Sequence, residues 1–271
     1  MAIHPSAIIH PGAEIDASAD VGPFCVVGPR VRIGAGTRLV SHVSVMGETT
    51  LGTNNTVHPF ASLGGAPQDL KFKGEPARLV VGNDNTFREG VTLNIGTAGG
   101  HMETRVGSNC LFMAYSHVAH DCIVGDRVVV ANSGALAGHV TLGDGVIMGG
   151  MAGVHQFTRV GRNAFIGGGA MVAQDVPPFC IAQGDRAKLG GLNVIGLKRQ
   201  GWTKPQIQAI RAAFLTIFVP KTTRANGLAE VEATLAPQHA LVAEFCKFIR
   251  EAKRGVCSAR VGAKDDSDGV D

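Results

Sequence analysis

Large apolar residues recur at every sixth position along most of this chain. One run extends from Ile3 to Leu63, and a second extends from Val106 to Val172. A small or slender residue follows each apolar one after four positions. A spacing of six matches neither the period of an amphipathic helix nor the alternation of an ordinary strand. It predicts a chain wound into short strands, with the large and the small residue of each hexapeptide both facing inward.

Three hexapeptides close one triangular coil, so residues 18 apart lie above one another, and successive coils stack at a strand spacing of about 4.8 Å. Glycine often follows the apolar residue directly, as at Gly22, Gly34 and Gly107. We expect these glycines to adopt a backbone conformation that is costly for other residues. The pattern predicts an all-β solenoid, a parallel β-helix of hexapeptide repeats.

Two insertions interrupt the period, at residues 64–78 and 96–105. Insertions in a solenoid become loops on one face, often the binding face. The period ends at Pro177-Pro178, and Thr203 followed by Pro205 then marks a helix start. We therefore expect a β-helix over residues 1–189 and a C-terminal helical domain over 190–271. Its expected parts are a helix after Thr203, helices over 228–235 and 240–252, and a polar tail from about 255.

Composition and charge narrow the function. The 271 residues include 37 glycines, and the net charge of +3 is too small to indicate a nucleic-acid-binding protein. No apolar run is long enough for a membrane span, and the N-terminus lacks the pattern of a secretory signal. The six cysteines form no CxxC pair. They are expected to be reduced thiols of a cytoplasmic protein that is not inserted in a membrane.

One strip of the solenoid collects groups suited to acid–base chemistry. Stacking by 18 places His120, Gly138 and Gln156 in one column, Asp121 and His139 in the next, and His117 and His155 beside them. His120 and Gln156 would lie two coil rises apart, about 9.6 Å, with the bare backbone of Gly138 between them. A histidine can accept a proton at neutral pH, an adjacent carboxylate can hold its tautomer, and a glycine N–H can stabilise an oxyanion.

Longer motifs surround these positions. They are His117-Val-Ala-His120-Asp121-Cys122, Leu136-Ala-Gly138-His139-Val140, Gly150-Met-Ala-Gly-Val-His155-Gln156-Phe157, Ala173-Gln-Asp-Val-Pro-Pro178, Gly65-Ala-Pro-Gln-Asp69-Leu-Lys71 and Gly196-Leu-Lys-Arg199. With them the chain resembles the UDP-N-acetylglucosamine acyltransferases, hexapeptide-repeat enzymes that begin lipid A synthesis. The likeness is close over residues 1–200 and looser in the helical domain. It implies that the β-helix winds left-handed.

The resemblance also implies an activity. That family transfers an (R)-3-hydroxyacyl chain from acyl carrier protein to the 3-hydroxyl of UDP-N-acetylglucosamine, at sites between the subunits of a homotrimer. By this likeness His120 is the general base, Asp121 orients its ring, and the Gly138 N–H stabilises the oxyanion. No cofactor, metal or cysteine nucleophile is implied. The residues that would bind the nucleotide sugar are Asp69, Lys71, His117, His139, His155, Gln156, Asn193 and Arg199, with Lys71 and Arg199 suited by charge to the diphosphate.

Three further positions qualify the resemblance. The family measures acyl length with a groove, and the matching residue is Gly168, whose missing side chain favours a chain of about fourteen carbons. Many relatives carry Glu where this chain has Ile195, and Arg where it has Gln200. Because Ile195 cannot accept a hydrogen bond, we expect the uridine contacts near Asn193 to be weaker or differently arranged.

Other functions are compatible with the same solenoid. His117, His120 and His139 could bind zinc at a subunit interface, as in carbonic anhydrases of this fold. Asp121, Gln156, the first insertion and the helical domain would then lack a role. A non-catalytic scaffold would not need the strip of acid–base residues at all. The sequence also leaves open whether the acceptor is the 3-hydroxyl sugar or its 3-amino analogue, since His120 would be the base for either.

Overall fold

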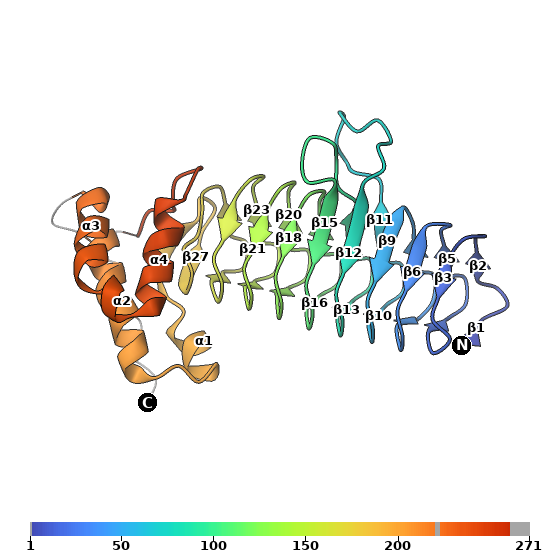
Figure 1. The fold of residues 1–271 in the computed structure, drawn as a ribbon, viewed down its shortest axis with the longest axis horizontal. Helices are drawn as coiled ribbons and strands as arrows, with labels where there is room; N and C mark the ends of the chain where they lie inside the picture. The colour runs from blue at the N-terminus through green and yellow to red at the C-terminus, as the bar shows by residue number, and fades with distance from the viewer. Residues whose placement is uncertain (1, 220–222, 261–271) are drawn as a thin grey trace.

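Short strands alternate with turns along most of the chain, and each strand pairs with the strand one coil later. The computed structural model describes residues 2–219 and 223–260. It forms an elongated three-sided solenoid with helices at its C-terminal end (Figure 1). The strand pairs of the coils are parallel, with Ile3 beside Val21 and Val118 beside Leu136. This register confirms the predicted stacking of residues 18 apart.

The strands form three sheets, one for each side of the solenoid. The first sheet contains, in spatial order, β1 (Ala2–Ile3), β4 (Asp20–Val21), β7 (Arg38–Leu39), β10 (Thr56–Val57), β13 (Thr86–Phe87), β16 (Leu111–Phe112), β19 (Val129–Val130), β22 (Ile147–Met148), β25 (Phe165–Ile166), β27 (Cys180–Gln183) and β28 (Lys188–Leu192). The second contains β2 (Ile8–Ile9), β5 (Val26–Val27), β8 (Ser44–Val45), β11 (Ser62–Gly65), β14 (Thr92–Asn94), β17 (His117–Val118), β20 (Ala135–Leu136), β23 (Gly153–Val154) and β26 (Met171–Val172). The third contains β3 (Glu14–Ile15), β6 (Val31–Ile33), β9 (Glu48–Leu51), β12 (Arg78–Val81), β15 (Glu103–Val106), β18 (Ile123–Val124), β21 (Thr141–Leu142) and β24 (Arg159–Val160).

The core lies inside the coils and repeats with them. Large residues of the six-residue pattern, such as Leu39 and Leu136, are fully buried, and so are slender ones such as Cys25. The rings of Phe87 and Phe112, one coil apart, stack with centroids 5.1 Å apart. Since burying one Leu or Phe side chain contributes about 1.5–3 kcal/mol, the repeat itself supplies the stability of the solenoid.

The glycines that follow apolar residues are required for a reason other than the one expected. Gly22 and Gly34 do not have a left-handed backbone. Instead, a Cβ at Gly22 would collide with the carbonyl oxygen of Val40 in the next coil, and one at Gly34 would lie 2.6 Å from the Gly52 oxygen. The expectation of a costly backbone conformation was therefore wrong for these glycines, because what excludes a side chain is the closeness of the neighbouring coil.

The two insertions leave the solenoid at the same corner, between the second and third sheets. The first insertion joins β11 to β12 and the second joins β14 to β15, and they project side by side (Figure 1). The amide nitrogen of Ile95 donates to the Gly65 oxygen at 3.1 Å, and the Asn94 side chain donates to the Ala66 oxygen at 3.0 Å. Hydrogen bonds therefore tie the two insertions together where they begin.

A group of short helices packs on the last coil. They are α1 (Val194–Arg199), α2 (Lys204–Phe218), α3 (Arg224–Thr234), the 3₁₀ helix η1 (Ala236–Gln238) and α4 (Ala240–Arg250). The guanidinium of Arg162 donates two hydrogen bonds of 2.6 Å to Glu244 of α4, and this bidentate pair joins the domain to the solenoid. None of the helices in the described ranges is long and apolar enough to cross a membrane.

The helical domain differs from expectation in three places. Helix α1 and the antiparallel β27–β28 hairpin were not predicted, and α3 begins four residues before the expected 228. The segment expected to begin a polar tail instead pairs with the solenoid, since Val256 bridges Asp175 and Ala259 bridges Leu189. These bridges bury Cys257 against the last coil. The rest of the expected tail, residues 261–271, lies outside the described residues.

Candidate active site

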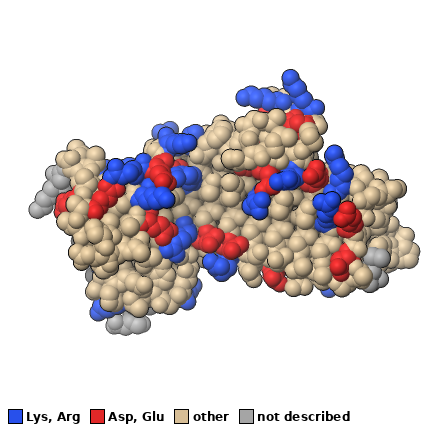
Figure 2. Space-filling view, in the orientation of Figure 1, with Lys and Arg blue, Asp and Glu red and all other residues tan. Residues whose placement is uncertain are grey.

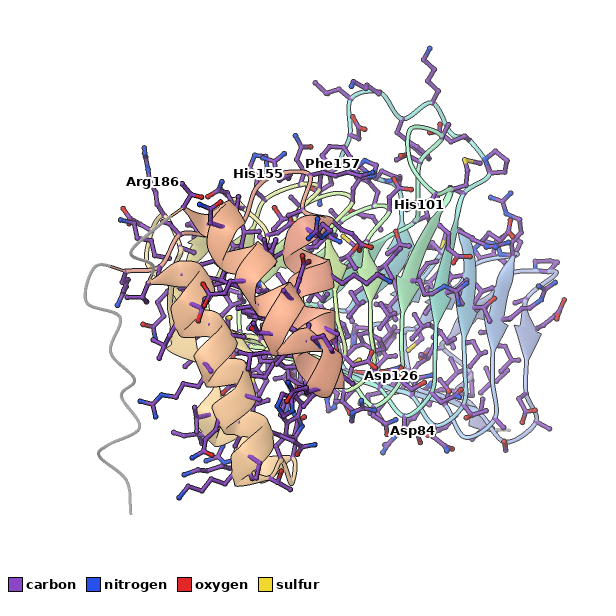
Figure 3. All side chains as sticks on the ribbon, turned by 60° about the vertical axis from the view of Figure 1, so that its left-hand side comes forward. Asp84, His101, Asp126, His155, Phe157 and Arg186 are labelled. Atoms are coloured by element: carbon purple, nitrogen blue, oxygen red, sulfur yellow. The ribbon has the colours of Figure 1, made fainter. Side chains whose placement is uncertain are left out.

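A cavity of about 990 Å³ lies beside the corner from which the insertions project. Eight of the predicted site residues line it, namely Asp69, Lys71, His117, His120, Gly138, His139, His155 and Gln156. Figure 3 shows His101, Phe157 and His155 along this edge of the solenoid, with Asp84 and Asp126 on another corner. The structure therefore brings together the strip of residues that the 18-residue spacing predicted.

His120 and Asp121 form a hydrogen-bonded pair at the wall of the cavity. Nδ1 of His120 lies 2.9 Å from Oδ2 of Asp121. Because an ionised carboxylate can only accept, Nδ1 carries the proton, and Nε2 is the basic nitrogen of the neutral ring. A Cβ at Gly138 would lie 2.7 Å from Nε2 of His120, so the ring rests against the bare glycine. The pair can therefore act as a general base.

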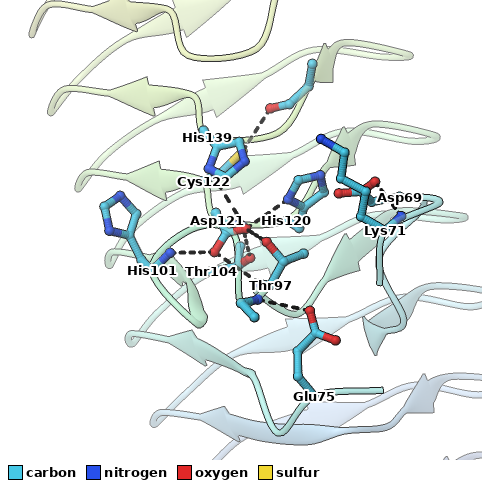
Figure 4. A network of polar contacts seen from close by, with 12 residues as sticks. Asp69, Lys71, Glu75, Thr97, His101, Thr104, His120, Asp121, Cys122 and His139 are labelled. Atoms are coloured by element: carbon cyan, nitrogen blue, oxygen red, sulfur yellow. Dashed lines mark hydrogen bonds and ion pairs between the residues drawn. The ribbon is translucent and has the colours of Figure 1, made fainter. Parts of the chain in front are cut away.

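The Asp121 carboxylate is buried and accepts four hydrogen bonds (Figure 4). Besides His120, the donors are the Thr97 hydroxyl to Oδ2 at 2.6 Å, the Thr97 amide to Oδ1 at 3.1 Å and the His101 amide to Oδ1 at 2.8 Å. Burial acts to raise the pKa of Asp121, but the hydrogen bonds from Thr97, His120 and His101 outweigh it and lower that pKa below its usual value. The carboxylate is therefore ionised near neutral pH.

Two more histidines border the base. The ring of His139 stacks on Phe157 with centroids 4.3 Å apart and meets the His120 ring edge-on. Nδ1 of His117 lies 2.7 Å from the Thr92 hydroxyl. Burial is the main cause that lowers the pKa of both His117 and His139 below the usual histidine value. Both rings are therefore neutral near pH 7 and can exchange hydrogen bonds with a sugar or a base.

The three histidines of the zinc alternative do not come together within one chain. Among the described residues, the ligand atoms that cluster within 4.8 Å belong to His120, Asp121 and His139, and His117 is not among them. The Nδ1 atom of His120 faces the Asp121 carboxylate, and the same carboxylate oxygen accepts from the Thr97 hydroxyl. Since these atoms hydrogen-bond one another, the arrangement within one chain is that of an oriented base.

The first insertion supplies a positive charge at the rim of the cavity. The Lys71 amide donates to Oδ1 of Asp69 at 3.0 Å, a turn that places both side chains at the cavity. Lys and Arg side chains gather at the tip of the projecting loops, whereas over the helices they alternate with acidic ones (Figure 2). An exposed ammonium at this place suits a phosphate group.

Comparison with known proteins identifies the family. A family model described as UDP-N-acetylglucosamine O-acyltransferase, domain 2, matches residues 175–257, and a bacterial transferase hexapeptide model matches residues 103–133. An acyl-(acyl-carrier-protein)–UDP-N-acetylglucosamine O-acyltransferase of Anaeromyxobacter sp. (strain Fw109-5) is 50% identical over 256 residues, which cover 94% of this chain and 99% of the relative. The chain belongs to the UDP-N-acetylglucosamine O-acyltransferase family.

Other members of this O-acyltransferase family agree in sequence and in fold. The enzyme of the same name from Myxococcus xanthus (strain DK1622) is 51% identical over 210 residues, covering 78% of this chain and 81% of the relative. The structure titled LpxA from Acinetobacter baumannii matches with a TM-score of 0.92 and 41% identity, covering 94% of this chain and 99% of that one. The predicted fold class, a left-handed parallel β-helix with a C-terminal helical domain, is confirmed.

Besides Asp121, which is buried, three predicted site residues of this O-acyltransferase do not line the cavity of the single chain. Asn193 caps α1 by accepting from the Gly196 amide at 3.1 Å, and Arg199 is exposed at the end of the same helix. Gly168 lies in an exposed turn between the first and second sheets. Of the two departures from the family pattern, Ile195 is exposed and Gln200 donates to the Asn163 side chain at 3.0 Å. The roles of Asn193, Arg199 and Gly168 stay predictions.

Some residues of the O-acyltransferase site were missed by sequence reasoning. The rule that residues 18 apart lie above one another could have found Phe157. It lies 18 positions after His139, and the His139 ring stacks on it. Thr97 and His101 lie in the second insertion, and Asp185 and Arg186, which line the cavity, lie between β27 and β28. No repeat register reaches these irregular segments, so only the folded chain brings them to the site.

Proposed function

We propose that this protein transfers an (R)-3-hydroxyacyl chain from acyl carrier protein to the 3-hydroxyl of UDP-N-acetylglucosamine, the first step of lipid A biosynthesis. The observation that carries the proposal is the His120–Asp121 pair, held against Gly138 at the wall of the cavity. The names of the relatives supply both substrate classes, an acyl carrier protein and UDP-N-acetylglucosamine.

The reaction follows from the tautomer of His120. Nε2 removes the proton of the sugar 3-hydroxyl while its oxygen attacks the thioester carbonyl of the acyl carrier protein. The Gly138 N–H, for which the described part of the chain offers no acceptor, stabilises the negative oxygen of the tetrahedral intermediate. When this intermediate collapses, the carbon–sulfur bond breaks and the leaving thiolate takes the proton from His120. The Asp121 carboxylate stabilises the imidazolium between these two transfers.

The cavity residues then divide the binding of the nucleotide sugar. The neutral rings of His117 and His139 border the base and hydrogen-bond the sugar, together with Asp69, His155 and Gln156. Lys71 binds the diphosphate side, and Arg199 and Asn193 complete the site from outside the cavity of one chain. The last assignment requires more than one subunit, because Arg199 and Asn193 do not line this cavity.

A homotrimer meets this requirement, and the surface of the chain supports one. Four large apolar side chains are more than half exposed in a row of turns between the first and second sheets, namely Phe24, Phe60, Tyr115 and Met151. Exposed apolar rows of this kind mark protein–protein contacts. We expect Phe60→Asp to convert the trimer into monomers in sedimentation equilibrium, and Phe60→Leu to leave it assembled. A wild-type monomer at all concentrations would contradict this assembly.

We also propose a cytoplasmic location and a reaction that needs no cofactor. All six cysteines are buried free thiols, and burial raises the pKa of Cys122 to about 12. Such thiols persist in a reducing compartment and are poor nucleophiles. The proposed reaction needs only the base and the oxyanion donor, so neither a metal nor a thiol takes part in it.

The test is acyl transfer by the purified protein from 3-hydroxyacyl carrier proteins of ten to sixteen carbons to UDP-N-acetylglucosamine. We expect transfer to be greatest near fourteen carbons and His120→Ala to lower kcat/KM by about 10⁴-fold. Gly168→Met should shift the preference to shorter chains, because its side chain would shorten the expected acyl groove. A Cβ at Gly168 would meet only the Gly150 oxygen, at 3.5 Å, so the side chain has room to enter. An inactive wild type would contradict the proposal, whereas activity only with the 3-amino sugar nucleotide would change the acceptor alone.

A further inference from the structure

A chain of hydrogen bonds joins both insertions to the catalytic pair. We infer that Thr97 is a positioning residue, whose hydroxyl fixes the Asp121 carboxylate as the partner of His120, and that Glu75 fastens the segment carrying Thr97 to the first insertion. This inference rests on the proposed function and adds to it a link between the loop that binds substrate and the base.

The Thr97 hydroxyl acts on the oxygen that matters for the base. It donates to Oδ2 of Asp121 at 2.6 Å, and the same oxygen accepts from Nδ1 of His120 at 2.9 Å. Thr97 is buried and does not line the cavity. Its hydroxyl therefore reaches the reaction only through the carboxylate, by holding one orientation of it.

The turn around Thr97 packs closely against the Asp121 carboxylate. The amides of Gly100 and Met102 both donate to the backbone carbonyl oxygen of Thr97, at 3.1 and 3.2 Å, and Met102 has a left-handed backbone. A Cβ at Gly100 would collide with the carboxylate of Asp121. The turn thus wraps the carboxylate so closely that a shift of the second insertion would displace it.

Glu75 of the first insertion holds this turn in place. One of its carboxylate oxygens accepts from the Ala98 amide at 2.9 Å, and the other accepts from the Lys73 amide at 2.8 Å. Ala98 directly follows Thr97, and Lys73 lies two residues after Lys71 at the cavity rim. Glu75 therefore connects the loop expected to bind the nucleotide sugar with the turn that orients the base.

The first experiment removes the Thr97 hydroxyl at constant shape. We expect Thr97→Val to lower kcat by about 10- to 100-fold, since a hydrogen bond to a charged group is lost, while KM and calorimetric binding of UDP-N-acetylglucosamine stay unchanged. Thr97→Ser, which keeps the hydroxyl, should restore most of kcat. Wild-type kcat in Thr97→Val, or a loss that Ser does not restore, would overturn the inference.

A double-mutant cycle separates positioning from a general structural effect. In an Asp121→Asn background, Thr97→Val should cause no further loss of kcat, because the hydroxyl acts through the carboxylate. Fully additive losses would contradict the inference. If Thr97→Val does not fold, as judged by circular dichroism, Thr97→Ala, which also lacks the hydroxyl, replaces it in both backgrounds, with Thr97→Ser as the control.

The second experiment cuts the connection at Glu75. Glu75→Ala should raise KM for UDP-N-acetylglucosamine and also lower kcat. Glu75→Gln keeps one oxygen that can accept from the Ala98 amide but loses the bond from the Lys73 amide, so its effect should be smaller. Unchanged kinetics in Glu75→Ala would refute the connection. If the wild type itself transfers no acyl chain, the proposed function fails, and an active wild type with unaffected Thr97 and Glu75 variants refutes the inference alone.

Discussion

Two aspartates occupy the same position of the repeat on different corners of the solenoid, yet only one of them has the surroundings of a catalytic group. Asp84 and Asp121 both adopt a left-handed backbone, with φ of 57° and 59°. Asp84 is exposed and accepts one side-chain hydrogen bond, from Asn54 at 3.2 Å. Asp121 is buried and accepts four. The repeat places aspartates at turns, and further structure decides their chemistry.

The second insertion makes the difference. It covers Asp121 and donates the hydrogen bonds of Thr97 and His101, whereas no insertion within the described residues covers the corner of Asp84 and Asp126 (Figure 3). Burial without these donors would raise the pKa of a carboxylate, and with them the pKa is lowered. The solenoid therefore sets the spacing of the site, while the insertions set its electrostatics.

We expect the largest difference between Asp121 and Asp84 when each is replaced by asparagine. In Asp121→Asn one oxygen can still accept from the Thr97 and His101 amides, but the side-chain NH₂ then faces Nδ1 of His120. It donates to Nδ1 and forces the ring proton onto Nε2, where the base must be free. We expect kcat/KM for acyl transfer to fall about 10³-fold.

The matched control is Asp84→Asn, for which we expect wild-type kcat/KM. It makes the same chemical change at an exposed turn with the same backbone. Equal losses in the two variants would show that the substitution damages the solenoid rather than the base.

A smaller effect is expected when the base is moved rather than altered. A Cβ in Gly138→Ala would lie 2.6 Å from Cε1 and 2.7 Å from Nε2 of His120, so the ring must shift away from the oxyanion donor. We expect this displacement of the ring, on the order of 1 Å, to lower kcat/KM about 10²-fold. Gly190→Ala serves as the control, because its Cβ would meet no atom closer than 3.6 Å. A Gly138→Ala variant as active as this control would exclude close packing of the base on the glycine.

The regular part of the molecule could be predicted from the sequence because one physical rule governs it. The inward residues of each hexapeptide must be apolar, so the six-residue period predicted the three-sided coil. Because residues 18 apart lie above one another, the same period also predicted the strip from His117 to Gln156. The glycine prediction failed because a repeated glycine can reflect either a special backbone or a close neighbour. Only the stacked coils reveal that Gly22 faces the Val40 oxygen.

The irregular part could not be predicted, because its residues are placed by contacts between distant segments. Nothing around Thr97 in the sequence points to Asp121, and the hydrogen bond of Glu75 to Ala98 joins two loops separated by a complete coil. Helix α1 is only six residues long, too short for its pattern to be recognised, and it depends on the Asn193 cap. The parts missed are thus those that complete the site.

The smallest effect that we predict is on stability, and it tests whether Asp121 is ionised in the folded state. The pKa of Asp121 is lower in the folded than in the unfolded chain, so its charge stabilises the fold at pH values above the unfolded pKa, about 3.9. This contribution is lost as the pH falls through the folded pKa. The free energy of unfolding of Asp121→Asn should therefore lie furthest below that of wild type at neutral pH, and the gap should narrow toward pH 3.

Urea unfolding followed by circular dichroism between pH 3 and 7 measures this gap. Glu89 and Glu103, whose pKa values are also lowered, titrate in both proteins and cancel in the difference. A gap that stays constant or widens in acid would mean that Asp121 carries no stabilising charge, and the insertion would then differ from the other corners in shape alone.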